Sequence, residues 1–203
     1  ITNFGNMLYN KFREKLKSPG VFSLNDIKMY YPGFDHRRLF EWQKKNYVKP
    51  LRSGHYIFSD IEINYEMALF IANRIYDPSY VSMESALSYH GLIPEAIANV
   101  TSVSSMKTKS FSNSISVFSY RSVKPELFFG YEILETEKFP IKIADKEKAV
   151  IDFFYLNPGY NSINKVADLR IETAELNKKV LFRYISRINN KSLEKRIKLL
   201  FDD

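Results

Sequence analysis

The sequence predicts an α+β protein: an N-terminal winged helix-turn-helix, then a mixed domain with an antiparallel sheet and C-terminal helices. Two changes of pattern predict this order. Residues 3–46 show helical apolar spacing interrupted by Pro-Gly turns, and residues 47–58 then read as two short strands. Residues 100–143 alternate Val, Ser, Thr, Phe and Tyr before helical spacing returns. Core material is ample, because 45% of the 203 residues are hydrophobic.

Three helices are expected before residue 47. The first covers residues 3–17, and its apolar side chains are Phe4, Met7, Leu8, Phe12 and Leu16. Ser23 and Asp35 are the expected N-caps of a second helix and of a third helix at residues 36–46, because their side chains accept hydrogen bonds from first-turn amides. The helices are therefore short and closely connected.

A hairpin should follow the third helix. Residues 47–51 and 55–58 are rich in β-branched and aromatic side chains around an Arg-Ser-Gly turn. Pro50 lacks a backbone N–H, so it places the first strand at a sheet edge. We expect residues 1–59 to form the N-terminal domain and residues 60–78 to form a helix that connects it to the next one.

The second domain is expected to span residues 60–203. Ser82 should cap a helix that ends at Gly91, and residues 100–143 should form four or five antiparallel strands. Asp145 should cap a helix with the sequence KEKAVIDFFYL. Two basic amphipathic helices then complete the domain.

Charge distribution indicates a polyanion partner for the first domain. Residues 1–60 hold 11 Lys or Arg against 5 Asp or Glu, whereas residues 61–160 hold 9 against 12. A helical wheel of residues 36–46 groups Leu39, Phe40, Trp42 and Gln43 on one arc and the cations, with Glu41, on the other. The candidate DNA contacts are Arg37, Arg38, Lys44, Lys45, Lys49, Arg52 and His55. The alternative is an ordinary solvated charged face.

Catalytic and cofactor signals are weak. The chain has no Cys, which excludes disulfides and thiolate metal sites and fits a reducing, cytoplasmic location. Its 3 His show no metal-ligand spacing, no cofactor is expected, and no apolar run approaches the ~18 residues of a membrane span. Asp145, Glu147 and Asp152 follow a predicted strand, as acidic residues do in metal-dependent nucleases. A structural role is the simpler interpretation, because Asp145 can cap the next helix and Glu147 can interact with the dipole of its first turn.

Residues 80–95, YVSMESALSYHGLIPE, resemble the AbiEi family of antitoxins from type IV (abortive-infection) toxin–antitoxin systems of phage defence. The resemblance continues through NVTSVSSMKTKSF, FSYRSVKPELFFGYE and IADKEKAVIDFFYL, and covers about residues 5–160. It implies an N-terminal winged helix that binds inverted repeats in double-stranded operator DNA and represses its own operon. It also implies a C-terminal domain that counters a nucleotidyltransferase-like toxin, without requiring a direct complex.

By position, the resemblance assigns the operator contacts to Arg37, Arg38, Lys44, Lys45 and Arg52. It transfers no catalytic residue. Two alternatives stay open: an enzyme that acts on the toxin or on nucleic acid through Asp145 and Glu147, and a transcription factor uncoupled from any toxin.

Overall fold

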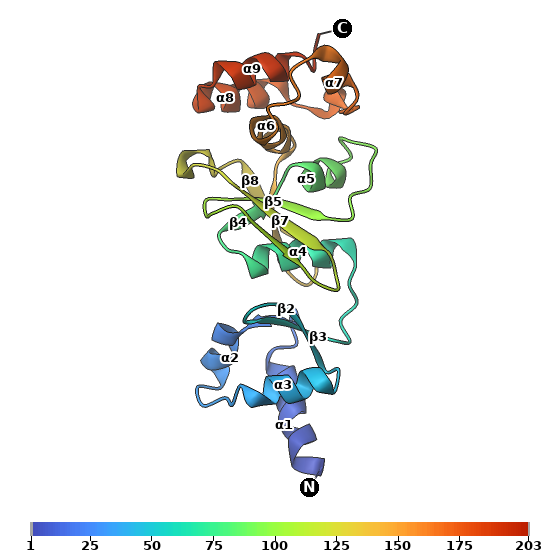
Figure 1. The fold of residues 1–203 in the computed structure, drawn as a ribbon, viewed down its shortest axis with the longest axis vertical. Coiled ribbons are helices and arrows are strands. Elements are labelled where there is room, and N and C mark those ends of the chain that lie inside the picture. Colours follow the sequence, from blue (N-terminus) through green and yellow to red (C-terminus); the bar gives the residue numbers. More distant parts are fainter. Residues whose placement is uncertain (1, 203) are drawn as a thin grey trace.

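The structure, a computed structural model, describes residues 2–202, with side chains from residue 8 onward (Figure 1). The expected core side chains Phe4 and Met7 therefore lie outside the described residues. The prediction of an α+β protein is confirmed. The first elements are α1 (Thr2–Lys15), β1 (Val21–Ser23), α2 (Leu24–Tyr30), α3 (Arg37–Lys44), β2 (Val48–Arg52) and β3 (His55–Phe58).

The remaining elements follow residue 64. The strands are β4 (Ser79–Val81), β5 (Val100–Ser104), β6 (Lys109–Ser112), β7 (Val117–Ser122), β8 (Tyr131–Glu135) and β9 (Pro140–Ala144). The helices are α4 (Tyr65–Ile75), α5 (Glu84–Tyr89), α6 (Lys146–Leu156), α7 (Ile163–Ala167), α8 (Lys178–Ile188) and α9 (Lys191–Lys198). Short 3₁₀ turns occur at Pro125–Leu127 and Thr173–Glu175.

The N-terminal unit combines α1–α3 with an antiparallel sheet in the order β1-β3-β2. β2 is an edge strand, as Pro50 predicted. Because successive strand residues point to opposite faces, the sheet is buried on both sides. Phe22, Val48 and Phe58 pack against the helices, whereas Val21, Leu51 and Ile57 join the core of the second unit. β1, only three residues long, was not predicted.

Helix starts agree with the sequence at Ser23 and differ at two other places. Ser23 and Asp26 form a capping box at α2. At α3, His36 occupies the N-cap position, although the Asp35 carboxylate still accepts from the Arg37 amide at 3.0 Å. α4 begins at Tyr65, where Asn64 caps it, and not near residue 60.

α4 is also not a simple connector. Most of its side chains are buried, and it packs against β4, β5 and β9. It therefore forms the layer of the second unit that faces the N-terminal sheet (Figure 1). Its apolar residues are Met67, Ala68, Leu69, Phe70, Ile71, Ala72 and Ile75.

The second unit is built on a six-stranded sheet in the order β6-β7-β5-β4-β9-β8. The prediction of an antiparallel sheet is confirmed in part: β4–β5, β6–β7 and β8–β9 are antiparallel pairs, whereas β5–β7 and β4–β9 are parallel, so the sheet is mixed. α5 and α6 lie on the face opposite α4, and α8 and α9 pack on α6 at the far end of the molecule (Figure 1). Within residues 2–202, no helix is long and apolar enough to cross a membrane.

Candidate nucleic-acid interface

α3 lies in the part of the N-terminal unit that is farther from the second unit, with the strands β2 and β3 between them (Figure 1). Leu39 and Trp42 are 2% and 3% exposed and hold the helix on the first core. Trp42 contacts the ring of Phe12 with centroids 4.7 Å apart. Trp42 is thus a core residue, and the helix turns its remaining side chains outward.

The outward side of α3 carries four cations and one aromatic ring. Arg38 on this side is half-buried, and the exposed residues are Arg37, Phe40, Glu41, Lys44 and Lys45. The wheel-based prediction that Phe40 packs inward is wrong, since Phe40 is 60% exposed. Phe40 lies about 100° from Leu39 on the wheel, at the border of the buried arc. The Lys44 ammonium sits 4.5 Å from the Phe40 ring centroid, which orients both side chains.

Arg37 and Arg38 lie at the N-terminal end of this face. The Arg37 guanidinium pairs with Asp35 at 2.9 Å and lowers the pKa of that carboxyl, mainly through the hydrogen bond between the two side chains. Both groups are in contact with solvent, so this ion pair is weak and Arg37 can exchange Asp35 for another partner at little cost. In the described part of the chain, Arg38 and Lys45 form no ion pair. The face is thus an accessible array of cations.

Lys49 and His55 lie outside α3, on the hairpin. Lys49 is exposed on the edge strand β2. His55 is partly buried on β3, and this burial, helped by the charge of Arg52, lowers its pKa below the ordinary value of about 6.5. The lowered pKa disfavours the charged form of His55, so its contribution of positive charge to the hairpin is reduced.

Arg52 does not point to the free tip of the hairpin, where the sequence placed it. Its guanidinium donates to the Ile75 carbonyl and lies 4.5 Å from the ring centroid of Phe111. Asn113 adds a second contact, donating to the Leu51 carbonyl at 2.9 Å. Arg52 thus ties the hairpin to the second unit, a role that requires the tertiary contact and that no local sequence pattern indicates.

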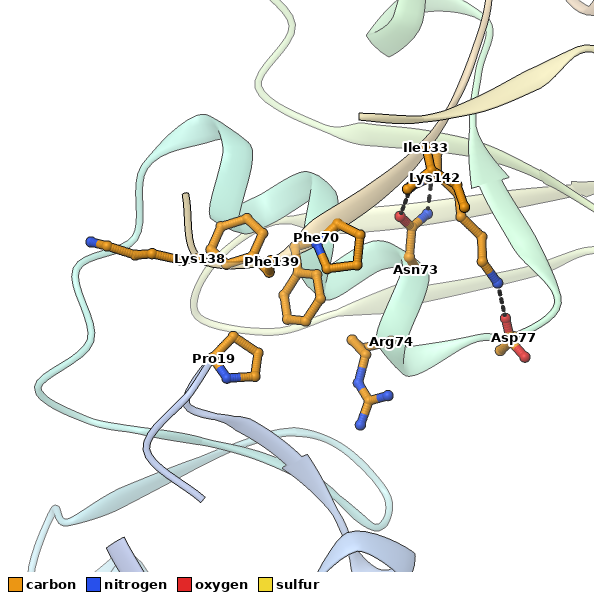
Figure 2. A pocket seen from close by; sticks show the side chains of 10 residues that line it. Pro19, Phe70, Asn73, Arg74, Asp77, Ile133, Lys138, Phe139 and Lys142 are labelled. Atoms are coloured by element: carbon orange, nitrogen blue, oxygen red, sulfur yellow. Dashed lines mark hydrogen bonds and ion pairs between the residues drawn. The ribbon is translucent and has the colours of Figure 1, made fainter. Parts of the chain in front are cut away.

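A cleft of about 500 Å³ also lies between the two units (Figure 2). On one side Phe70 and Phe139 stack with ring centroids 4.5 Å apart, and Pro19 faces them from the N-terminal unit. Arg74 bridges the units by pairing with Asp26 at 2.7 Å. Together with Arg52, this pair fixes the position of α3 relative to the second unit.

The interior of the second unit contains a polar cluster that the sequence did not predict. Lys148 and Asp152 form an ion pair on α6, and both are buried. Tyr80 donates to Asp152 at 2.9 Å and accepts from Lys148 at 2.9 Å, while Ser82 donates to Asp152 at 2.8 Å. The expected N-cap role of Ser82 is wrong, because Met83 occupies that position. The i,i+4 spacing of Lys148 and Asp152 was the only available signal.

The other two acidic candidates have separate structural partners. Asp145 caps α6, as predicted, by accepting from the Lys148 amide at 2.7 Å, and it accepts from the Tyr184 hydroxyl at 2.7 Å. Burial and this contact raise the pKa of Tyr184 to about 12. Glu147 accepts from the Asn177 amide at 2.7 Å. Among the described residues, no group of three or more His, Asp or Glu side chains is arranged to hold a metal ion.

No family model matches the sequence, and no curated protein matches it either. The resemblance to the AbiEi antitoxins therefore stays a prediction from the residues quoted above.

Proposed function

We propose that the protein binds double-stranded DNA through α3, the recognition helix of an N-terminal winged helix-turn-helix. The observation that carries the proposal is the outward face of α3, where three exposed cations and the half-buried Arg38 lie opposite the buried Leu39 and Trp42. The major groove is wide enough to admit such a helix. The element order α1-β1-α2-α3-β2-β3 and the sheet order β1-β3-β2 also support a winged helix.

The two ends of α3 are assigned to different parts of the DNA. In helix-turn-helix proteins the N-terminal residues of the recognition helix contact base edges, so we assign Arg37 and Arg38 to guanine readout. Lys44 and Lys45, near the C-terminal end, hold phosphates. Lys49 on the edge strand reaches the adjacent backbone. Arg52 is left out of the contact set, because its guanidinium binds the second unit.

The biological role rests on the resemblance to the AbiEi family. On this basis the DNA is an inverted repeat upstream of the gene, and binding represses the operon. The second unit counters the effect of a nucleotidyltransferase-like toxin encoded alongside. The protein then acts by binding and not by catalysis.

A DNA-binding titration tests the role of α3. The full chain is mixed with a labelled duplex from its own upstream region, and affinity is measured by fluorescence anisotropy from 50 to 200 mM salt. Replacing Arg37 and Arg38 together with Ala should weaken binding at least 10-fold and reduce the preference for this duplex over one of unrelated sequence, because both residues are assigned to base readout. The matched control replaces two exposed cations of the second unit, Lys107 and Lys109, with Ala. Equal affinity of both double variants and wild type would refute the assignment.

A co-expression assay tests the antitoxin role separately. Cells carry the nucleotidyltransferase-like gene that neighbours this one, together with the full chain or its Arg37→Ala, Arg38→Ala variant. The variant should lose repression of a promoter reporter but still restore growth, because the second unit is intact. If wild type does not restore growth, the antitoxin role fails while DNA binding stands.

A further inference from the structure

A row of cations runs along α8, at the end of the molecule opposite α3 (Figure 1). Lys179, Arg183 and Arg187 are spaced four residues apart, so they lie on one side of the helix about 6 Å apart along its axis. All three are exposed, while Leu181 and Ile185 on the other side are buried. The helix therefore offers a slanted row of positive charge to solvent.

The charges in this row are not neutralised within the described residues. The ion pairs in this region join Lys146 to Glu175 and Lys198 to Glu194, and none includes a member of the row. The Arg187 guanidinium instead lies 3.8 Å from the ring centroid of Phe129. This contact holds the planar group in place and leaves its N–H donors available.

The row ends in a concave site of about 510 Å³. The polar residues that line it are Lys124, Glu126, Tyr155, Arg187, Asn189, Asn190 and Lys191. They come from separate segments: the turn before Leu127, the end of α6 and the connection between α8 and α9. The site thus combines three cations, one carboxylate, two amides and a phenol ring.

We infer that this row and site, which we call the α8 surface, bind the phosphodiester backbone of a single-stranded nucleic acid. The cations follow the phosphates, and the concave site receives one base beside Tyr155. The Asn189 amide meets the polar edge of the base there, and Asn190, whose Oδ1 accepts from the Leu193 amide as the N-cap of α9, adds its side-chain N–H donors. Only an unpaired base can enter, so a duplex does not fit. The three cations outnumber the single carboxylate, Glu126, which favours a polyanion over a neutral ligand.

An anisotropy titration of the full chain tests this inference. The probes are a 20-nucleotide single-stranded RNA, the single-stranded DNA of the same sequence and the corresponding DNA duplex. The single strands should bind more tightly than the duplex when α3 carries Arg37→Ala and Arg38→Ala, because these changes remove the duplex site proposed above. The two single strands distinguish an RNA from a DNA ligand.

Substitutions locate the binding surface. Replacing Arg183, Arg187 and Lys191 with Ala should weaken single-strand binding at least 10-fold and lower its salt slope by about 2 units, since each bound phosphate contributes ~0.7. Arg187→Lys keeps the charge but removes the planar stack, so it should weaken binding less. The control variant, Lys107→Ala with Lys109→Ala, should bind as wild type. Circular dichroism and thermal unfolding verify that each variant is folded.

Three outcomes would overturn the inference. If the folded variant with Ala at Arg183, Arg187 and Lys191 binds the single strands as tightly as wild type, the α8 surface does not bind them. Tighter binding of the duplex than of either strand, in the α3 variant, means that the surface is not a single-strand site. Competition by polyglutamate as effective as that of the nucleic acid at equal charge indicates an acidic protein partner instead. The first and third outcomes do not involve α3. The second rests on the proposed function and counts only where the α3 changes themselves weaken duplex binding, so the failure of one proposal can be told from the failure of the other.

Discussion

Lys148 and Asp152, one turn apart on α6, form an ion pair in which both side chains are almost completely withdrawn from solvent, at 0% and 1% exposure. The pair is closely hydrogen-bonded, because Tyr80 contacts both partners and Ser82 donates to the carboxylate. Through Tyr80 on β4 and Ser82 directly after β4, the pair joins α6 to the sheet. A buried pair of this kind is costly to break but not necessarily stabilising as a whole.

Removing one partner of this pair should destabilise the protein strongly. Asp152→Ala leaves an uncompensated buried ammonium, so we expect the free energy of unfolding to fall by about 3–5 kcal/mol in a urea titration. Asp77→Ala, which breaks the exposed pair with Lys142, is the matched control and should cost under about 1 kcal/mol. The double change Lys148→Met with Asp152→Leu should recover much of the stability. Equal effects of Asp152→Ala and Asp77→Ala would contradict this account.

Gly130 leaves room for the Lys148 stem. A methyl group at Gly130 would lie 2.9 Å from Lys148 Cγ, and the residue has a φ of +72°. Gly130→Ala should therefore lower the free energy of unfolding by about 1–3 kcal/mol through overlap and backbone strain. At Gly33 nothing lies within 4 Å of the added carbon, so Gly33→Ala should be nearly neutral. A similar urea midpoint for the two variants would show that the Lys148 stem moves aside.

We expect Arg52 to contribute to the stability of the protein and not to its affinity for duplex DNA. Arg52→Ala removes the bond to the Ile75 carbonyl and the stacking on Phe111, so we expect the free energy of unfolding to fall by about 1–3 kcal/mol in a thermal or urea titration. The salt slope of duplex binding should stay at the wild-type value. Lys49→Ala, on the same strand but exposed, should show the reverse pattern. If folded Arg52→Ala has a lower salt slope than wild type, Arg52 does contact DNA.

Acid should weaken the contact between the units through Asp26. Partial burial alone would raise the pKa of Asp26, but hydrogen bonds from Ser23 and the charge of Arg74 outweigh it and lower the pKa. A lowered folded-state pKa means that the stabilisation is present above the unfolded value of about 3.9 and is lost as pH falls through the folded pKa.

The pH dependence of the unfolding free energy measures this effect. Below about pH 4, stability should fall less steeply in Asp26→Asn than in wild type. Ser23→Ala keeps the carboxylate but removes its hydroxyl donor, so it should give an intermediate slope. Identical slopes in all three proteins would mean that the contacts of Asp26 do not lower its pKa.

Glu41 should oppose DNA binding. It is exposed on α3 among the proposed contacts, and a carboxylate there repels phosphate. Glu41→Gln should therefore tighten duplex binding several-fold at 50 mM salt, and the gain should shrink at 200 mM salt because exposed charges are screened. Weaker binding of the variant would indicate instead that Glu41 accepts a hydrogen bond from a cytosine amino group.

The sequence by itself determined the local elements. Ser23, Asp145 and Pro50 each act within a few residues of their own position, as caps or as an edge-strand residue, so their roles could be read from type and spacing. The inward placement of Trp42 followed in the same way from helical periodicity. β1 and β4 were missed because three residues are too few to show a period.

The tertiary structure alone decided the long-range contacts. The strand order and the parallel pairs of the second sheet depend on neighbours distant in sequence, which no local pattern encodes. Arg52 could be read as a basic turn residue, but its partners Ile75 and Phe111 come from elements that meet it only in the fold. Asp152 likewise acquires its partners Tyr80 and Ser82 across some 70 residues, which is why a capping and periodicity argument could not find the buried cluster.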